Sequence, residues 1–287
     1  MKNYLQLTKP SIMLLVIITG ATALIIEGSL LGHPGKFLLV LLALYLTGGS
    51  ANALNQYFER DIDAKMSRTS KRRPLPQGMI KPQRALIFSV SIGIAGVLIF
   101  GFVFNWFTAA LSLATILFYS LFYTLFLKPN TAQNIVIGGI AGAMAPVGAW
   151  AAATGRTDIV PWILFLIVFL WTPPHFWALA LFYKEDYHKS KLPMLPVVRG
   201  EDVTLRQILF YSVLLVLSSL LLFIFQSGWF YLAIALSAGT RFILKAVQAQ
   251  KYRTDKHFRR LFGYSIAYLF VLFIAIVLDD FIQKLLA

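Results

Sequence analysis

Long apolar runs alternate with short polar segments along the whole chain. Nine of the runs come close to the roughly 20 residues that an α-helix needs to cross a bilayer. The predicted spans are residues 11–27, 37–57, 85–106, 107–127, 134–154, 160–182, 207–225, 229–246 and 262–282. No polar segment between them is long enough to bury a core of its own. The pattern predicts an all-α, polytopic membrane bundle in which residues 1–287 form a single membrane domain.

Composition narrows the classes of function. Hydrophobic residues make up 58% of the chain and charged residues only 13%. The absence of cysteine excludes thiol catalysis, structural disulfides and thiolate metal sites. A net charge of +14 would suggest nucleic acid as the partner of a soluble protein, but the sequence has no RNA- or DNA-binding motif. Topology and contact with anionic lipid explain the basic residues. We therefore expect the chain to be embedded in a lipid bilayer and to bind no nucleic acid.

The basic residues predict an orientation. With the N-terminus inside, all but three of the 26 Lys and Arg residues lie in inside segments, the exceptions being Lys36, Arg156 and Lys284. The positive-inside rule therefore predicts a cytoplasmic N-terminus and an external C-terminus. The chain shows no transit peptide, which favours the inner (plasma) membrane of a bacterium over a mitochondrion.

Two inside loops, 58–84 and 183–206, hold seven of the twelve acidic residues. Acidic residues contribute little to topology, so their concentration needs another reason. Each loop has clustered acids and bases and then a proline-rich turn before the next span, in the manner of a weak internal repeat. Two related half-sites facing one cavity are expected.

At the start of the first loop, oxygen-bearing side chains recur every four residues. Asn55, Glu59 and Asp63 fall on one face of a helix, and Asn52 extends that face one turn into the membrane. Such oxygen ligands suit Mg²⁺. The alternative is that the asparagines only join helices and the two acids are solvated at the interface.

Basic residues follow this column directly. Arg68 and either Arg72 or Arg73 are candidates to neutralise a substrate diphosphate, with Lys65 as a further binding candidate. Carboxylates, Mg²⁺ and guanidinium groups together can ionise an allylic diphosphate. For residues 71–73, anchoring to anionic lipid is the alternative role.

The sixth predicted span contains Pro173 and Pro174, which are expected to break or kink it and expose backbone to a cavity. His175 would lie deep in this span. It is either a hydrogen-bonded packing residue or a group that binds heme iron or orients a propionate.

Three residues near the start of the second loop are further candidates for the functional site. Asp186, eleven residues after His175, comes back close to the same helix face at the cavity mouth. It either binds Mg²⁺ or pairs with a neighbouring lysine. Tyr183 and Lys184 are candidates for substrate binding.

Residues 55–69, followed by the Arg-Pro-Leu-Pro turn at 73–76, resemble the first motif of the UbiA-type intramembrane prenyltransferases. Segments in the rest of the chain resemble, more narrowly, those members of the family that farnesylate heme. Glu59, where most relatives carry Asp, belongs to this narrower likeness, as do residues 134–139, 172–180, 186–187 and 193–197.

The resemblance implies nine helices around a central cavity whose cytoplasmic mouth is capped by the two acidic loops. It also implies Mg²⁺ as cofactor, farnesyl diphosphate and heme b as substrates, heme O for terminal oxidases as product, and contact with heme A synthase or oxidase assembly proteins. By position, the catalytic residues it implies are Asn55, Glu59, Asp63, Arg68 and Asp186, with Glu59, Asp63 and Asp186 as the Mg²⁺ ligands.

The chain departs from the family pattern at two places. Phe182 stands where relatives carry the first Asp of the second motif, so that half-site is one carboxylate short unless Tyr183, Glu185 or water replaces it. The first motif is one residue longer than usual between its arginines, which leaves Arg72 and Arg73 as equal candidates.

Two other functions fit parts of the sequence. One is prenyl transfer to another aromatic acceptor, such as 4-hydroxybenzoate. The other is transport, because nine spans with a pseudo-repeat and broken helices also describe carriers. A carrier does not need a carboxylate column beside paired arginines, so the motifs favour an enzyme.

Overall fold

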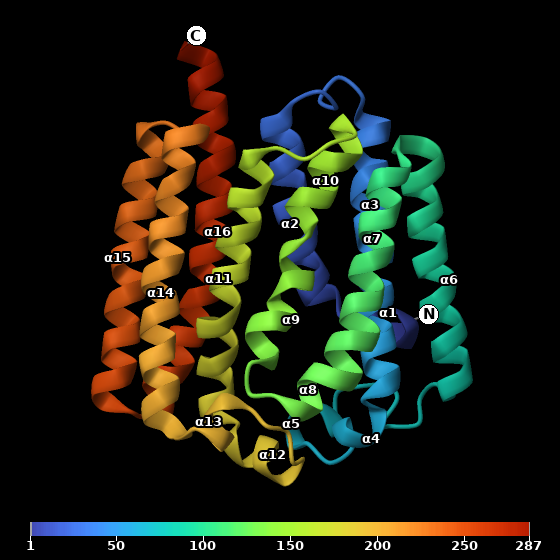
Figure 1. The fold of residues 1–287 in the computed structure, drawn as a ribbon, viewed down its shortest axis with the longest axis vertical. Coiled ribbons are helices and arrows are strands. Elements are labelled where there is room, and N and C mark those ends of the chain that lie inside the picture. The colour runs from blue at the N-terminus through green and yellow to red at the C-terminus, as the bar shows by residue number, and fades with distance from the viewer. Residues whose placement is uncertain (1, 287) are drawn as a thin grey trace.

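A computed structural model describes residues 2–286 of the chain, and within this range nine helical spans are long and apolar enough to cross a membrane (Figure 1). The all-α class and the number of spans agree with the sequence prediction. The spans are α2 (Pro10–Glu27), α3 (Pro34–Phe58), α6 with η1 (Pro82–Ile99, Phe100–Phe104), α7 with η2 and α8 (Trp106–Leu117, Phe118–Leu127, Lys128–Asn130), α9 with α10 (Asn134–Ala143, Ala145–Thr154), α11 (Ile159–Phe182), α14 (Gly200–Phe225), α15 (Trp229–Tyr252) and α16 (Asp255–Leu286). Short helices lie between them: α1 (Lys2–Leu7), α4 (Arg60–Asp63), α5 (Ser67–Ser70), α12 (Lys184–Lys189) and α13 (Leu195–Val198).

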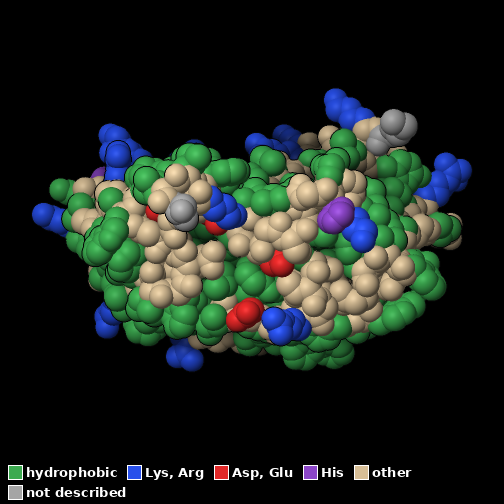
Figure 2. Space-filling view, turned by 90° about the horizontal axis from the view of Figure 1, so that it is seen from above, with side chains coloured by type: hydrophobic (Ala, Val, Ile, Leu, Met, Phe, Trp, Pro, Cys, Tyr) green, Lys and Arg blue, Asp and Glu red, His purple; other side chains and the backbone are tan. Residues whose placement is uncertain are grey.

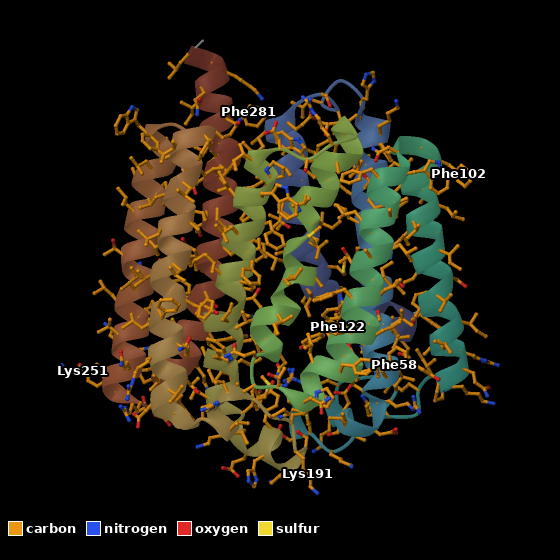
Figure 3. All side chains as sticks on the ribbon, in the orientation of Figure 1. Phe58, Phe102, Phe122, Lys191, Lys251 and Phe281 are labelled. Carbon is orange, nitrogen blue, oxygen red and sulfur yellow. The ribbon has the colours of Figure 1, made fainter. Side chains whose placement is uncertain are left out.

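The spans pack into a closed bundle. α2 contacts α3 and α10, α11 contacts α9 and α14, and α16 packs against α11 and α2, which joins the two ends of the chain of spans. Large apolar side chains cover the outer surface: Phe102 is 75% exposed and Trp229 77% exposed. Phe102 projects away from the bundle in Figure 3. Such a surface is stable only against lipid, and the chain is a multi-pass membrane protein.

The polar elements gather at one end of the bundle. α4, α5, α8, α12 and α13 lie together at the lower end of Figure 1, and Lys191 and Lys251 project from that end in Figure 3. The opposite end, seen in Figure 2, carries few charged side chains within a hydrophobic rim. The described C-terminal part of α16 reaches that opposite end. The two acidic loops thus share one side of the membrane, as predicted.

Local sequence explains where several helices begin and end. Pro10, Pro34 and Pro82 occupy the first turns of α2, α3 and α6, where a missing N–H costs nothing. α2 ends at Gly28, whose φ of +88° suits glycine and whose N–H donates to the Leu24 carbonyl.

Two predicted helix starts were several residues too late. α14 begins at Gly200 rather than 207, and α16 begins at Asp255 rather than 262. Hydropathy detects the apolar part of a helix, whereas the backbone hydrogen bonds continue through its charged turns at the interface.

Pro173 and Pro174 were predicted to break or kink their span, and a break is wrong because α11 runs unbroken from Ile159 to Phe182. Proline removes a backbone donor and frees a carbonyl one turn earlier. Just before the prolines, the Thr172 hydroxyl donates to the Val168 carbonyl at 2.9 Å, adding a bond within the helix.

The interrupted span is the fifth instead. α9 ends at Ala143 and α10 begins at Ala145, so Met144 lies between two half-helices. Pro146 follows in the first turn of α10 and limits continuation of the α9 hydrogen bonds. Met144 lines the central cavity, in keeping with the rule that irregular backbone at membrane depth borders a cavity.

Candidate active site

A cavity of about 470 Å³ lies among the spans. Its walls are mostly apolar and come from α2, α3, α7, α9, α10, α11 and α16, with Met13, Leu44, Trp171, Phe262 and Phe270 among the lining residues. This volume and lining are typical of sites that bury small molecules.

Polar residues enter the cavity wall close to the two loops. Arg68, at the mouth, and Asn52 and Tyr123 belong to the lining. Asn52 is buried and its amide lies 3.5 Å from the Met13 sulfur. Asn52 therefore faces the bundle interior, as predicted, without touching a charged group in the described residues.

The predicted column of oxygen-bearing side chains is present. The Glu59 N–H donates to the Asn55 carbonyl at 3.0 Å, and the Asp63 N–H donates to the Glu59 carbonyl at 2.8 Å. Helical spacing therefore continues across the junction of α3 and α4. All three side chains are buried, with 2–3% of each residue exposed.

Three basic side chains converge on this column. The Arg73 guanidinium forms an ion pair with Asp63, and its Nη1 lies 3.6 Å from Glu59 Oε2. Lys128 forms an ion pair with the other oxygen of Glu59. Lys9 donates from Nζ to the Asn55 side-chain oxygen at 2.8 Å.

Lys9 and Lys128 were missed by sequence reasoning. Each is one of many basic residues near the ends of the spans, and nothing in its sequence context sets it apart. Only the proline that follows each of them, Pro10 or Pro129, hints that the backbone there is restricted.

The two carboxylates have different electrostatic surroundings. Burial alone raises the pKa of Glu59, but Lys128, Arg73 and Lys9 outweigh burial and hold that pKa below its ordinary value. At Asp63, burial raises the pKa more than Arg73 lowers it, and the neighbouring Glu59 charge raises it further. The neighbouring basic groups therefore outweigh burial at Glu59 but not at Asp63.

Positive charge exceeds negative charge here. Arg73 and Lys128 contact the column, and Arg68 lies at the cavity mouth with a buried Nε that has no hydrogen-bond partner in residues 2–286. Lys9 is left out of this balance because burial, with the nearby Arg73, lowers its pKa strongly. Set against two carboxylates, this surplus favours binding of an anion with several oxygens. A diphosphate meets that requirement.

Asp186 does not join the carboxylate pair. It accepts hydrogen bonds from the Ser67 hydroxyl at 2.6 Å and from the Arg68 backbone N–H at 3.1 Å. No group of three His, Cys, Asp or Glu side chains able to hold a metal occurs in the described part of the chain. In this structure Asp186 links the two loops across 119 positions of sequence, and the three predicted Mg²⁺ ligands are not together.

We expect Asp186→Asn to loosen this link. Burial raises the pKa of Asp186, but the hydrogen bonds from Ser67 and Arg68 together outweigh burial and lower it. A lowered folded-state pKa means that the link is fully present above the unfolded-state pKa of about 3.9 and is lost only as pH falls through the lower folded value. At pH 7 the variant should therefore be cut faster by trypsin at exposed Lys65 and Lys184. Unchanged cleavage relative to a Glu185→Gln control would contradict the role of this link.

The other candidates from the loops lie apart from the column. Arg72 is exposed and shares a shallow surface site with Lys2 and Lys71. Of the two candidate arginines, Arg73 is therefore the one that reaches the carboxylates. Lys65 and Lys184 are also exposed.

Tyr183 is half-buried, and the Arg68 guanidinium lies 6.0 Å from its ring centroid. It therefore contacts the phosphate candidate Arg68 rather than the carboxylates.

His175 lines the cavity with its ring held between two aromatic groups. The centroids of Trp171 and Phe262 lie 4.2 and 4.5 Å from the imidazole, both nearly parallel to it. Ser265 donates its hydroxyl proton to the Phe262 carbonyl, so the His175 Nδ1 donates to the Ser265 oxygen at 2.7 Å. This tautomer leaves the lone pair on Nε2.

A π-helical segment shapes the site as well. In η2 the Thr124 hydroxyl donates to the Tyr119 carbonyl at 2.8 Å and accepts from the Asn55 amide at 3.2 Å. The wider turn aligns Thr124 with the column while the adjacent Tyr123 lines the cavity. The apolar and aromatic residues of this segment are equally compatible with an α-helix, so the sequence did not predict the π-helix.

Comparison with known proteins agrees with this fold. Residues 14–276 match the model of the UbiA prenyltransferase family. The chain belongs to this family of membrane-embedded prenyltransferases, so transport is not supported as its function.

Two similar curated proteins carry the name protoheme IX farnesyltransferase. The one from Synechocystis is 46% identical over 282 residues, covering 97% of this chain and 89% of that protein. The one from Symbiobacterium thermophilum is 47% identical over 283 residues, covering 97% of this chain and 94% of that protein.

Solved structures share the fold at low identity. A digeranylgeranylglyceryl phosphate synthase superposes with a TM-score of 0.80 at 22% identity, and the match covers 97% of this chain and 98% of the synthase chain. A UbiA homolog from Archaeoglobus fulgidus bound to DMAPP and Mg²⁺ gives a TM-score of 0.63 at 16% identity, covering 96% of this chain and 99% of its own.

Proposed function

We propose that this chain transfers a farnesyl group from farnesyl diphosphate to a vinyl group of heme b, with addition of water, to give heme O. The observation that carries the reaction class is the buried carboxylate pair, surrounded by surplus cations beside an apolar cavity. The names of the relatives that match nearly the full chain support heme as acceptor.

Glu59 and Asp63 are the proposed ligands of Mg²⁺, with Asn55 beside them. Their carboxylates fit the metal because an oxygen of each already converges on a single nitrogen of Arg73, so one cation can contact both. Hard oxygen ligands are those that Mg²⁺ prefers. When bound, Mg²⁺ supplies neutralisation of the diphosphate charge and so makes the diphosphate a better leaving group.

The cations of the chain bind the diphosphate. Arg68, Arg73 and Lys128 stabilise the negative charge that grows on it as its bond to C1 of the farnesyl group breaks. The electron pair of that bond leaves with the diphosphate, and an allylic cation remains. The apolar cavity keeps water away from this cation until the acceptor reacts.

The acceptor supplies the nucleophile. A vinyl carbon of heme b forms the new bond to C1, and the positive charge moves to the vinyl carbon next to the porphyrin ring. Water adds there and loses a proton, which gives a hydroxyethylfarnesyl side chain without a protein nucleophile. His175, with its lone pair on Nε2 and its ring fixed on both faces, is the proposed contact to the heme iron.

The charged end of the bundle is proposed to face the cytoplasm of a bacterium, with the C-terminus outside the inner membrane. The excess of Lys and Arg at that end supports this orientation. Heme O is then released to an oxidase assembly pathway, in which heme A synthase or oxidase assembly proteins are the proposed contacts.

We expect membranes that contain this protein to convert heme b in the presence of farnesyl diphosphate and Mg²⁺. Mass spectrometry should detect heme that carries a hydroxyethylfarnesyl group, and EDTA should abolish its formation. A parallel reaction with 4-hydroxybenzoate tests the other acceptor class. Prenylation of 4-hydroxybenzoate but not of heme would overturn the acceptor and keep the reaction class.

A further inference from the structure

Arg259 lies one turn outside the cavity on α16. Phe262, Ile266 and Phe270, which are three, seven and eleven residues further on, line the cavity. These spacings bring side chains back to one face of a helix, so Arg259 continues the cavity-lining face to the charged end of the bundle.

The guanidinium of Arg259 rests on aromatic side chains at the cavity mouth. It lies 5.1 Å from the ring centroid of Phe182, and Phe182 in turn contacts Phe262 at 6.0 Å and Tyr183 at 4.7 Å between centroids. The Arg68 guanidinium lies 6.0 Å from the Tyr183 ring. Two guanidinium groups thus flank an aromatic pair that joins α16 to α5.

No carboxylate neutralises Arg259 in the part of the chain that the structure describes. The ion pairs found there involve other basic residues, including Arg253, which pairs with Asp202 at 2.6 Å. The Arg259 side chain is exposed, so its donors are accessible to a ligand that lies at the mouth.

On this basis we infer that Arg259 binds a propionate carboxylate of the heme acceptor. The inference rests on the proposed function and adds the orientation of its substrate. Heme b carries its two propionates on the side of the macrocycle opposite its two vinyl groups. Carboxylates are costly to bury without a partner, so the propionate side stays at the polar interface beside α16. The vinyl side then points away from Arg259 and into the cavity.

The position of His175 is consistent with this orientation. His175 contacts Phe262, Phe262 contacts Phe182, and Phe182 lies under Arg259. One continuous aromatic surface therefore connects the proposed iron contact with the proposed carboxylate contact. A macrocycle whose iron contacts His175 can extend past this row of rings to the mouth, where a planar guanidinium can hold a carboxylate through two hydrogen bonds.

The test compares Arg259→Ala and Arg259→Lys with Arg260→Ala. Arg260 is the adjacent exposed basic residue, about 100° further round the helix, and it makes no aromatic contact in the described residues. Binding of zinc protoporphyrin IX, followed by fluorescence, measures affinity independently of turnover. A second titration uses its dimethyl ester, in which both carboxylates are masked.

Arg259→Ala should weaken binding of the free acid about tenfold and leave binding of the ester unchanged, since the lost contact is a charge-assisted hydrogen bond. Arg259→Lys should recover part of the loss, and Arg260→Ala should bind both porphyrins as the unmodified protein does. In turnover, Arg259→Ala should raise KM for heme b and leave KM for farnesyl diphosphate unchanged.

If Arg259→Ala weakened binding of the acid and of the ester equally, Arg259 would act only through packing, and the inference would be overturned. Unchanged binding of the acid in Arg259→Ala would also overturn it. A different result would contradict the proposed function alone. In that case the unmodified protein binds the free acid more tightly than Arg259→Ala does, but it transfers no farnesyl group to heme. An unmodified protein that binds neither porphyrin would overturn both.

Discussion

Asp63→Asn should lower the rate of farnesyl transfer at least about 100-fold. The substitution keeps the size of the side chain but removes the charge that holds both Arg73 and the proposed Mg²⁺. Loss of one preorganised electrostatic group in an active site typically costs 10²- to 10³-fold in rate. The measurement is heme O formation by purified protein under saturating substrates.

Asp61→Asn is the matched control for this variant. Asp61 belongs to the same four-residue helix, but it is exposed and its ion-pair partner is Arg60 at 3.8 Å. Its replacement should leave activity within about twofold, because exposed pairs of this kind contribute little. If Asp63→Asn and Asp61→Asn were equally active, the proposed metal site would be wrong. Thermal unfolding of both variants in detergent checks that loss of rate is not loss of fold.

Arg73→Met should also lower transfer strongly, by about 100-fold in kcat/KM for farnesyl diphosphate. Arg73 is the cation that reaches both carboxylates, and in the proposed reaction it binds the departing diphosphate. Arg73→Lys should keep part of the activity, since it retains a point charge and loses the planar pair of donors. Removing Arg73 leaves Asp63 buried without its partner, so a stability loss of about 3 kcal/mol is also expected.

Arg72→Met provides the comparison. The two arginines are neighbours in sequence, yet Arg72 is exposed and lies beside Lys2 and Lys71 at a separate surface site. Its replacement should leave kcat/KM nearly unchanged. A larger loss for Arg72→Met than for Arg73→Met would show that the loop adopts another arrangement when substrate binds.

The sequence by itself determined the architecture of the bundle. Nine apolar runs predicted nine spans, and the four-residue spacing of Asn55, Glu59 and Asp63 predicted their common face. Both are local properties. Burial of backbone in lipid requires each apolar run to satisfy its own hydrogen bonds as a helix, and helical geometry then dictates which neighbours share a face.

Only the tertiary structure decided which distant groups meet. Lys9 reaches Asn55 across 46 positions, and Lys128 reaches Glu59 across 69. Asp186, predicted as a third metal ligand, accepts a hydrogen bond from Ser67 across 119 positions. The choice of Arg73 over its neighbour also belongs here, since it depends on how the loop turns back over α4. Such contacts arise from the packing of helices and loops against one another, and the local spacing of residues does not encode that packing.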